Sequence, residues 1–79
     1  MIYPLCSLKP GQRGKVCFLR LDGAMRRRLF DIGLIEGTEI ECVLKAMSGE
    51  PAAYCIRGST IALRFDVTSQ IYVKLTVKE

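Results

Sequence analysis

The fold of this 79-residue chain is decided by the stretch Met25-Arg26-Arg27-Arg28-Leu29-Phe30-Asp31-Ile32-Gly33-Leu34-Ile35-Glu36-Gly37-Thr38. Within it, Met25, Leu29 and Ile32 recur at i, i+4 and i+7, which places them on one face of a helix. We therefore expect one helix, over about residues 23–32, in a sequence whose other segments are typical of strands.

Both ends of this helix carry characteristic residues. Asp22 is the expected N-cap, because its carboxylate can accept the free N–H groups of the first turn. Gly33 supplies the left-handed residue that commonly ends a helix, and Leu34 is expected to fold back onto the last turn. Glu36 and Gly37 then form the centre of a second turn, of type II, in which Gly37 takes a positive φ.

The helix also carries three consecutive arginines in its first half, where the helix dipole gives cations no advantage. Phe30 lies well off the apolar stripe. Two interpretations are open. In one, the arginines form a solvated face whose stems cover the rim of the core, and Phe30 tucks under a loop. In the other, Arg26, Arg27, Arg28 and Phe30 form a docking surface for an acidic partner, since arginine and aromatic residues are enriched at interfaces.

The length predicts a single domain, residues 1–79, with a small core. Hydrophobic residues make up 49% of the chain and charged residues 25%, a composition that argues against disorder. The net charge of +4 permits binding to anions but does not demand it. No segment is apolar over the roughly 20 residues that a spanning helix needs. The N-terminus lacks the regions of a signal peptide. We expect a cytoplasmic protein without membrane insertion.

The four cysteines are Cys6, Cys17, Cys42 and Cys55. No two of them form a C-x-x-C pair and the chain has no histidine, so a zinc site would need four thiolates that are remote in sequence. Their density is also far below that of a disulfide scaffold. We expect free thiols in the core, no metal site and no cofactor. Metal, redox and disulfide roles are the less favoured alternatives.

Alternation of apolar and polar residues predicts five strands. They cover residues 15–21, 38–45, 52–57, 60–65 and 71–77. The first does not alternate cleanly, which suggests a bulge between Phe18 and Leu19. The pair Gly58-Ser59 is typical of a type II′ hairpin turn.

Five short strands and one helix favour a small, mainly β barrel over a sandwich. The predicted core consists of Val16, Met25, Leu29, Ile32, Ile40, Leu44, Ile56, Leu63 and Val73. Phe65 is expected on the apolar face of its strand. Along the last strand Ile71, Val73, Leu75 and Val77 are expected to point inward.

Several motifs resemble the FeoA family of small cytosolic proteins in bacterial ferrous-iron uptake. The matching residues are Leu5-x-x-Leu8-x-Pro10-Gly11-x-x-Gly14-x-Val16, Arg27-Arg28-Leu29-Phe30-Asp31-Ile32-Gly33-Leu34-x-x-Gly37-Thr38, Glu39-Ile40-Glu41-Cys42, Gly49-x-Pro51 and Arg57-Gly58-x-x-Ile61-Ala62-Leu63-Arg64. The resemblance covers nearly the whole chain, and the helix–turn segment is its most specific part. Similar domains also form the C-terminal module of metal-dependent repressors.

The resemblance implies an SH3-like fold, which agrees with the barrel expected from the residues. It also implies an accessory or regulatory role and a partner, the membrane iron transporter FeoB, whose cytosolic part is a GTP-binding domain. We therefore expect the chain to bind a FeoB-like transporter, with Arg26, Arg27, Arg28 and Phe30 as the docking residues. A weak homo-oligomer stays open.

Three rival functions are disfavoured. The chain has neither a histidine for acid–base catalysis nor a phosphate-binding loop, so we expect no enzyme. The alternative, a small barrel that binds nucleic acid, needs a continuous basic stripe with interleaved aromatic residues. Asp31, Glu39 and Glu41 interrupt such a stripe, so we expect no nucleic acid. A proline-rich peptide binder is suggested by the barrel type alone, since the chain has no tryptophan.

Overall fold

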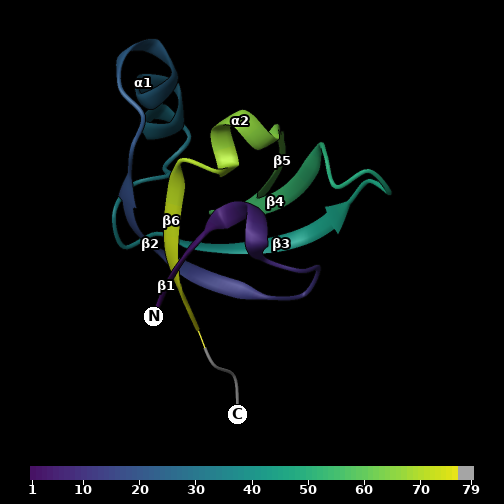
Figure 1. The fold of residues 1–79 in the computed structure, drawn as a ribbon. Coiled ribbons are helices and arrows are strands. Elements are labelled where there is room, and N and C mark those ends of the chain that lie inside the picture. The colour runs from purple at the N-terminus through teal and green to yellow at the C-terminus, as the bar shows by residue number, and fades with distance from the viewer. Residues whose placement is uncertain (77–79) are drawn as a thin grey trace.

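The structure is a computed structural model that describes residues 1–76 (Figure 1). Its elements, in chain order, are β1 (Ile2–Pro4), the 3₁₀ turn η1 (Leu5–Ser7), β2 (Arg13–Leu19), α1 (Gly23–Asp31), β3 (Glu39–Lys45), β4 (Ala52–Ile56), β5 (Ser59–Leu63), α2 (Phe65–Thr68) and β6 (Ile71–Leu75). The structure is therefore mainly β with one longer helix, as the sequence predicts.

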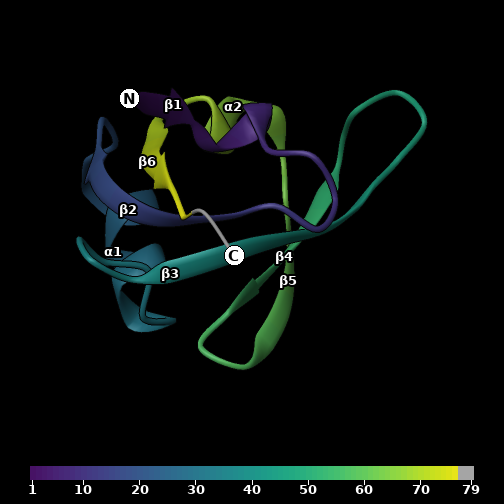
Figure 2. The same cartoon turned by 90° about the horizontal axis from the view of Figure 1, so that it is seen from below.

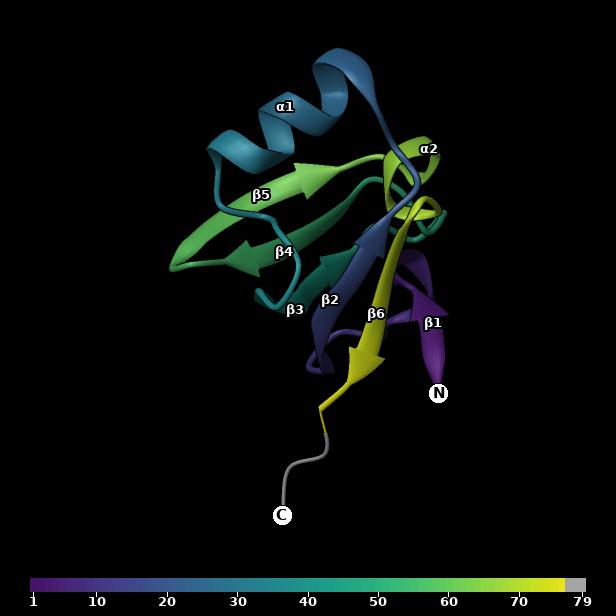
Figure 3. The same ribbon diagram turned by 90° about the vertical axis from the view of Figure 1, so that its left-hand side faces the viewer.

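The six strands form one antiparallel sheet in the order β1-β6-β2-β3-β4-β5. Figure 2 shows this sheet bending around the core, with η1 and α2 lying beside each other above it. In Figure 3, α1 lies outside the sheet and runs past β5. The sheet does not close, so β1 and β5 remain as its two edges.

The core fills the inside of the curved sheet. Predicted core residues Val16, Leu29, Ile40, Ile56 and Val73 are at most 2% exposed, and these predictions are confirmed. Met25 and Leu63 are partly buried and pack against the same cluster. The other buried hydrophobic residues are Leu5, Leu8, Leu34, Cys42, Ala52, Tyr54, Val67 and Ile71.

Two predicted core residues are on the surface instead. Ile32 is 37% exposed because α1 ends at Asp31, so Ile32 is the C-cap and no longer follows the helical period. Leu44 is 64% exposed because the pairing of β3 with β4 shifts between Cys42 and Leu44. Since a bulge reverses the side-chain alternation, the inward face that holds Ile40 and Cys42 does not continue to Leu44.

Several predicted element boundaries were also wrong. β1 was not predicted, so the sheet has six strands rather than five. The bulge in β2 lies between Val16 and Phe18, one residue before the expected position. Phe65 begins α2 instead of ending a strand and is 56% exposed. Leu75 is 36% exposed, and Val77 lies outside the described residues.

The β4–β5 hairpin uses a different turn from the expected one. Ile56 pairs with Ser59, so the two loop residues are Arg57 and Gly58 rather than Gly58 and Ser59. Both have positive φ, 49° and 87°, which is the pattern of a type I′ turn. The predicted type II′ turn is wrong, because an arginine takes the left-handed conformation that usually falls to glycine, asparagine or aspartate.

The end of α1 follows the prediction closely. Gly33 has φ 91°, and its N–H donates to the carbonyl of Phe30 while the N–H of Leu34 donates to the carbonyl of Leu29. These two bonds form a Schellman motif that buries Leu34. Gly37 has φ 93° in the following turn, as expected. Asp22 is the N-cap residue, but its side chain makes no capping hydrogen bond.

Candidate interaction surface around the helix

Helix α1 is held to the barrel mainly by one residue, Leu29, which is its only buried side chain. Most of the helix surface therefore faces solvent. Phe30 is 65% exposed, so the prediction that it lies off the apolar stripe is confirmed. An exposed phenylalanine ring forgoes the free energy that burial would provide, which makes Phe30 a candidate contact residue.

Phe30 lies beside a hollow of about 230 Å³ between α1 and β2. Phe18 and Ile35 also line this hollow and are 40% and 39% exposed. We call the surface formed by Phe18, Phe30 and Ile35 the Phe30 face. It brings together apolar residues from β2, α1 and the turn after the helix, so the fold rather than one sequence segment creates it.

The side chain of Arg26 is hydrogen-bonded within the fold. Its Nη1 atom donates to the backbone carbonyls of Leu19 and Leu21, at 3.2 Å each. These bonds join the first half of α1 to the segment that leaves β2. Arg26 lines the hollow of the Phe30 face, but its guanidinium already has internal partners.

Arg27 and Arg28 lie on different sides of the helix. Arg27 lines a shallow surface hollow together with Phe30. Arg28 instead lines a groove between α1 and β5, across the helix from the Phe30 face. The four predicted docking residues therefore do not form one patch: Arg26, Arg27 and Phe30 lie together, and Arg28 lies apart.

A further cation beside this surface was missed by sequence reasoning. The rings of Phe18 and Tyr72 stack with their centroids 4.8 Å apart and an angle of 15° between the ring planes. The guanidinium of Arg20 lies over both rings, 5.9 Å from the centroid of Phe18 and 5.5 Å from that of Tyr72. Phe18 and Arg20 are two residues apart in sequence, but the pairing of Phe18 with Tyr72 requires the strand order.

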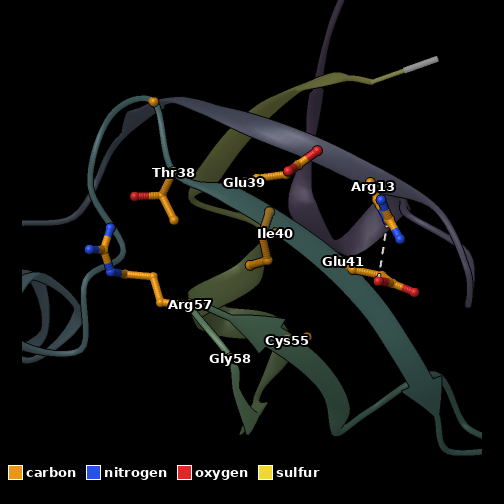
Figure 4. A pocket seen from close by; sticks show the side chains of 9 residues that line it. Arg13, Thr38, Glu39, Ile40, Glu41, Cys55, Arg57 and Gly58 are labelled. Atoms are coloured by element: carbon orange, nitrogen blue, oxygen red, sulfur yellow. Dashed lines mark ion pairs between the residues drawn. The ribbon is translucent and has the colours of Figure 1, made fainter. Parts of the chain in front are cut away.

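A second, polar hollow of about 370 Å³ lies where the start of β3 meets the β4–β5 turn (Figure 4). In it, Arg13 Nε and Glu41 Oε1 form an ion pair at 3.3 Å, which is the single ion pair within residues 1–76. Cys55 and Arg57 also line the hollow. Because both arginines and glutamates line this hollow, its charge favours neither an anionic nor a cationic ligand. No group of three or more histidine, cysteine, aspartate or glutamate residues in the described part of the chain could hold a metal ion.

The prediction that the thiols are core residues holds for only one of the four. Cys42 is fully buried, and burial raises the pKa of its thiol above the usual value of 9.0. Cys6, Cys17 and Cys55 are only partly buried. Cys55 lies on the face of β4 opposite to Tyr54, and Cys17 lies at the irregularity of β2 between Val16 and Phe18. All four thiols are free.

The helices within residues 1–76 are all too short or too polar to cross a membrane. Together, the curved six-stranded sheet and the exposed helix define a small SH3-like barrel. The sequence profile of the FeoA domain matches residues 3–75, and the chain belongs to the FeoA family. This family is linked to ferrous iron transport, and its match favours that role over nucleic-acid binding.

Solved structures agree with this assignment. The solution structure of FeoA from Chlorobium tepidum is 29% identical, with a TM-score of 0.88 over 96% of this chain and 72% of that one. The crystal structure of Stenotrophomonas maltophilia FeoA is 26% identical, with a TM-score of 0.77 over 94% of this chain and 89% of that one. That protein is described as a zinc complex, a prokaryotic SH3 domain protein and a candidate activating factor of ferrous iron transport.

A manganese-dependent transcriptional repressor in complex with manganese has the same fold at 19% identity. Its TM-score is 0.85 over 95% of this chain but only 37% of the repressor, so the barrel is one part of that longer chain. The likeness is one of fold alone. No curated protein matched the chain in sequence.

Proposed function

We propose that this protein is a cytoplasmic accessory protein of ferrous iron uptake that regulates a FeoB-like membrane transporter by binding its cytosolic, GTP-binding part. Membership of the FeoA family supports the iron-transport role. The observation that carries a binding mechanism is the 65% exposure of Phe30 at the centre of an apolar face rimmed by arginines. The protein acts as a binding module, and we assign it no catalytic step.

The Phe30 face has the composition of an interaction hot spot. Such sites combine an aromatic anchor with arginine, and truncating the anchor commonly costs about 2 kcal/mol or more of binding free energy. Arg20 and Arg27 lie next to the exposed rings, so the face favours a partner surface that carries carboxylates around an apolar pocket. Because Arg26 is hydrogen-bonded to backbone carbonyls, its role is to hold α1 in position beside the Phe30 face rather than to contact the partner.

The experiment is a pull-down of the transporter from native membranes with the tagged protein. Phe30→Ala and Arg27→Glu are compared with two matched controls on other surfaces, Met47→Ala and Lys9→Glu, whose side chains are also exposed. All variants are first checked for native circular dichroism. We expect Phe30→Ala to lower the recovered transporter by about tenfold or more, Arg27→Glu to lower it less, and both controls to match the wild type.

Two results would contradict different parts of the proposal. Equal recovery with every variant would place the docking surface elsewhere on the barrel. Failure to recover the transporter with the wild-type protein, from membranes shown to contain it, would reject the partner itself.

A further inference from the structure

The two edges of the sheet differ in how well they are protected from pairing with another strand. β1 is three residues long and ends in Pro4, which has no N–H to donate. β5 is five residues long, Ser59-Thr60-Ile61-Ala62-Leu63, and contains neither proline nor a charged residue. Natural sheets usually protect an edge with a proline, a charge or a short strand. β5 has none of these three features, so its own sequence leaves the edge unprotected.

The hairpin register shows which backbone groups are free. Ile56 pairs with Ser59 across a two-residue turn, so Ser59, Ile61 and Leu63 are the positions that bond to β4. The N–H and C=O groups of Thr60 and Ala62 then point away from β4. Within residues 1–76, no turn or loop hydrogen bond joins residues 59–63 to another segment. Two donors and two acceptors are therefore available along this edge.

A groove of about 350 Å³ is lined by residues of both α1 and β5. Figure 3 shows α1 running past β5. On its helix side the groove is lined by Met25 of α1 and by the C-cap residue Ile32, and on its sheet side by Ile61 and Leu63 of β5. Ile32 was expected in the core from the helical pattern but is 37% exposed, so its side chain is accessible from the groove. The groove thus offers apolar walls to the side chains of a chain that pairs with β5.

The charges of the groove indicate what occupies it. Arg28 and Arg64 line its two sides, Asp66 is its single acidic residue, and neither arginine forms an ion pair within residues 1–76. A second copy of this chain paired through β5 would place the arginines of both copies along one shared seam, in a protein whose net charge is already +4. Like charges at close range disfavour that dimer. An acidic segment would neutralise the arginines instead.

We propose that the free edge of β5 and the groove beside it bind an extended acidic segment of a partner protein as an added strand. The main-chain bonds to Thr60 and Ala62 supply affinity, as in other cases of strand addition. Because alternate side chains of a strand point to the same side, the groove side of the segment carries both apolar side chains against Met25 and Ile32 and carboxylates toward Arg28 and Arg64. This surface lies across α1 from Phe30, so it is independent of the docking face in the proposed function.

The test uses two synthetic peptides of eight residues. In the first, Val-Thr-Glu-Thr-Val-Thr-Glu-Thr, one face of the strand presents valine and glutamate in turn; in the second, lysine replaces both glutamates. Binding to ¹⁵N-labelled protein is followed by amide chemical shifts and hydrogen exchange. We expect the glutamate peptide to bind, to protect the amides of Thr60 and Ala62, and to leave the resonance of Phe30 unchanged. The lysine peptide is expected not to bind, because it would oppose Arg28 and Arg64.

A pair of variants at one position isolates the backbone bond. Ala62→Pro removes the outward N–H without touching the ladder to β4, and proline is tolerated on such an edge. Ala62→Val keeps the N–H and is the matched control. We expect Ala62→Pro to bind the glutamate peptide about three- to tenfold more weakly than Ala62→Val, which corresponds to one hydrogen bond. Arg28→Glu provides a second variant if Ala62→Pro does not fold, with the same direction expected.

Four outcomes would overturn the proposal. They are absence of binding by the glutamate peptide, equal binding by both peptides, protection confined to residues outside 59–63, and protection of Thr60 and Ala62 that grows with protein concentration when no peptide is present. The last outcome would make a second copy the occupant of the edge.

Discussion

Gly33 and Arg57 approach each other so closely that a Cβ atom on Gly33 would overlap the Cδ atom of Arg57. Gly33 ends α1 with φ 91°, and Arg57 is itself in the left-handed region with φ 49° in the β4–β5 turn. The arginine thus places its cation near the C-terminus of the helix, where the helix dipole favours it. This contact joins the segment between α1 and β3 to the hairpin that carries the open edge.

We predict that Gly33→Ala is more destabilising than an ordinary glycine substitution. A left-handed non-glycine residue costs about 1–2 kcal/mol, and the overlap with Arg57 adds to this. Gly11 is the matched control, since it has φ 94° but no atom within 4 Å of the position of its Cβ. In urea unfolding, Gly33→Ala should lose more stability than Gly11→Ala, and adding Arg57→Ala should remove the excess. Equal losses for the two glycines would contradict the contact.

The anchoring of α1 gives a second prediction. Leu29→Ala should cost about 2–5 kcal/mol of unfolding free energy, as expected for a leucine removed from a packed core. Leu44→Ala should cost less than about 0.5 kcal/mol, because that side chain is mostly in solvent. Chemical denaturation of the two variants measures both values. Similar losses would mean that the bulge in β3 is absent in solution.

These two leucines illustrate what the sequence can and cannot reveal about the fold. A regular period identifies Leu29 correctly, because it lies in the middle of a helix. Leu44 follows a bulge, and a bulge has no clear signature in a single sequence. β1 was missed for a related reason: its partner is β6, at the other end of the chain, and three residues ending in proline do not show an alternating pattern.

The candidate surfaces were predictable to a similar degree. The helical wheel placed Phe30 off the buried stripe, and the structure confirms its exposure. It could not place Arg28 apart from Arg26, because that separation depends on where β2 and β5 lie around α1. The open edge was beyond prediction altogether, since an edge is defined by strand order and not by the residues of the strand.

Tyr54 makes the stability depend on pH in the alkaline range. Burial, with smaller effects of Cys42 and Cys6, raises the pKa of Tyr54 to about 12 from its usual value of 10.0. Between about pH 10 and about pH 12 the unfolded chain has lost this proton while the folded chain keeps it, so stability falls as pH rises. The full loss is about 2–3 kcal/mol. The unfolding free energy of the wild type, measured in urea at several pH values across this range, should therefore fall more steeply with pH than that of Tyr54→Phe. Equal slopes for the two proteins would contradict the raised pKa of Tyr54.

The thiols should separate into two classes by reactivity. Cys42 is fully buried with a raised pKa, so it should resist iodoacetamide in the folded protein. Cys6, Cys17 and Cys55 are partly exposed and should be alkylated first. Mass spectrometry of peptides from briefly labelled protein measures each site, and labelling in urea gives the fully reactive reference. Elemental analysis of the same protein should find no bound metal. Rapid native labelling of Cys42, or stoichiometric metal that survives dialysis, would contradict these expectations.

The adjacent arginines Arg26 and Arg27 should differ in what they contribute. Arg26 donates two hydrogen bonds to the carbonyls of Leu19 and Leu21, so Arg26→Ala leaves both acceptors without this partner. Because the site is exposed, water replaces part of what is lost, and we expect a cost of about 1 kcal/mol. Arg27 makes no such bonds, and Arg27→Ala should change the unfolding free energy by less than about 0.5 kcal/mol.

Urea unfolding measures the unfolding free energies of the two alanine variants. The transporter pull-down then tests whether each arginine also affects binding. A binding defect of an Arg26 variant can come from a displaced α1, whereas a defect of Arg27→Glu in a fully stable protein points to the partner contact. The substitution Arg26→Lys keeps the charge but loses the planar fork that reaches two carbonyls, so it should share the stability loss. Equal stabilities of the Arg26 and Arg27 variants would show that the two backbone bonds do not hold the helix, and both arginines would then be free to serve the interface.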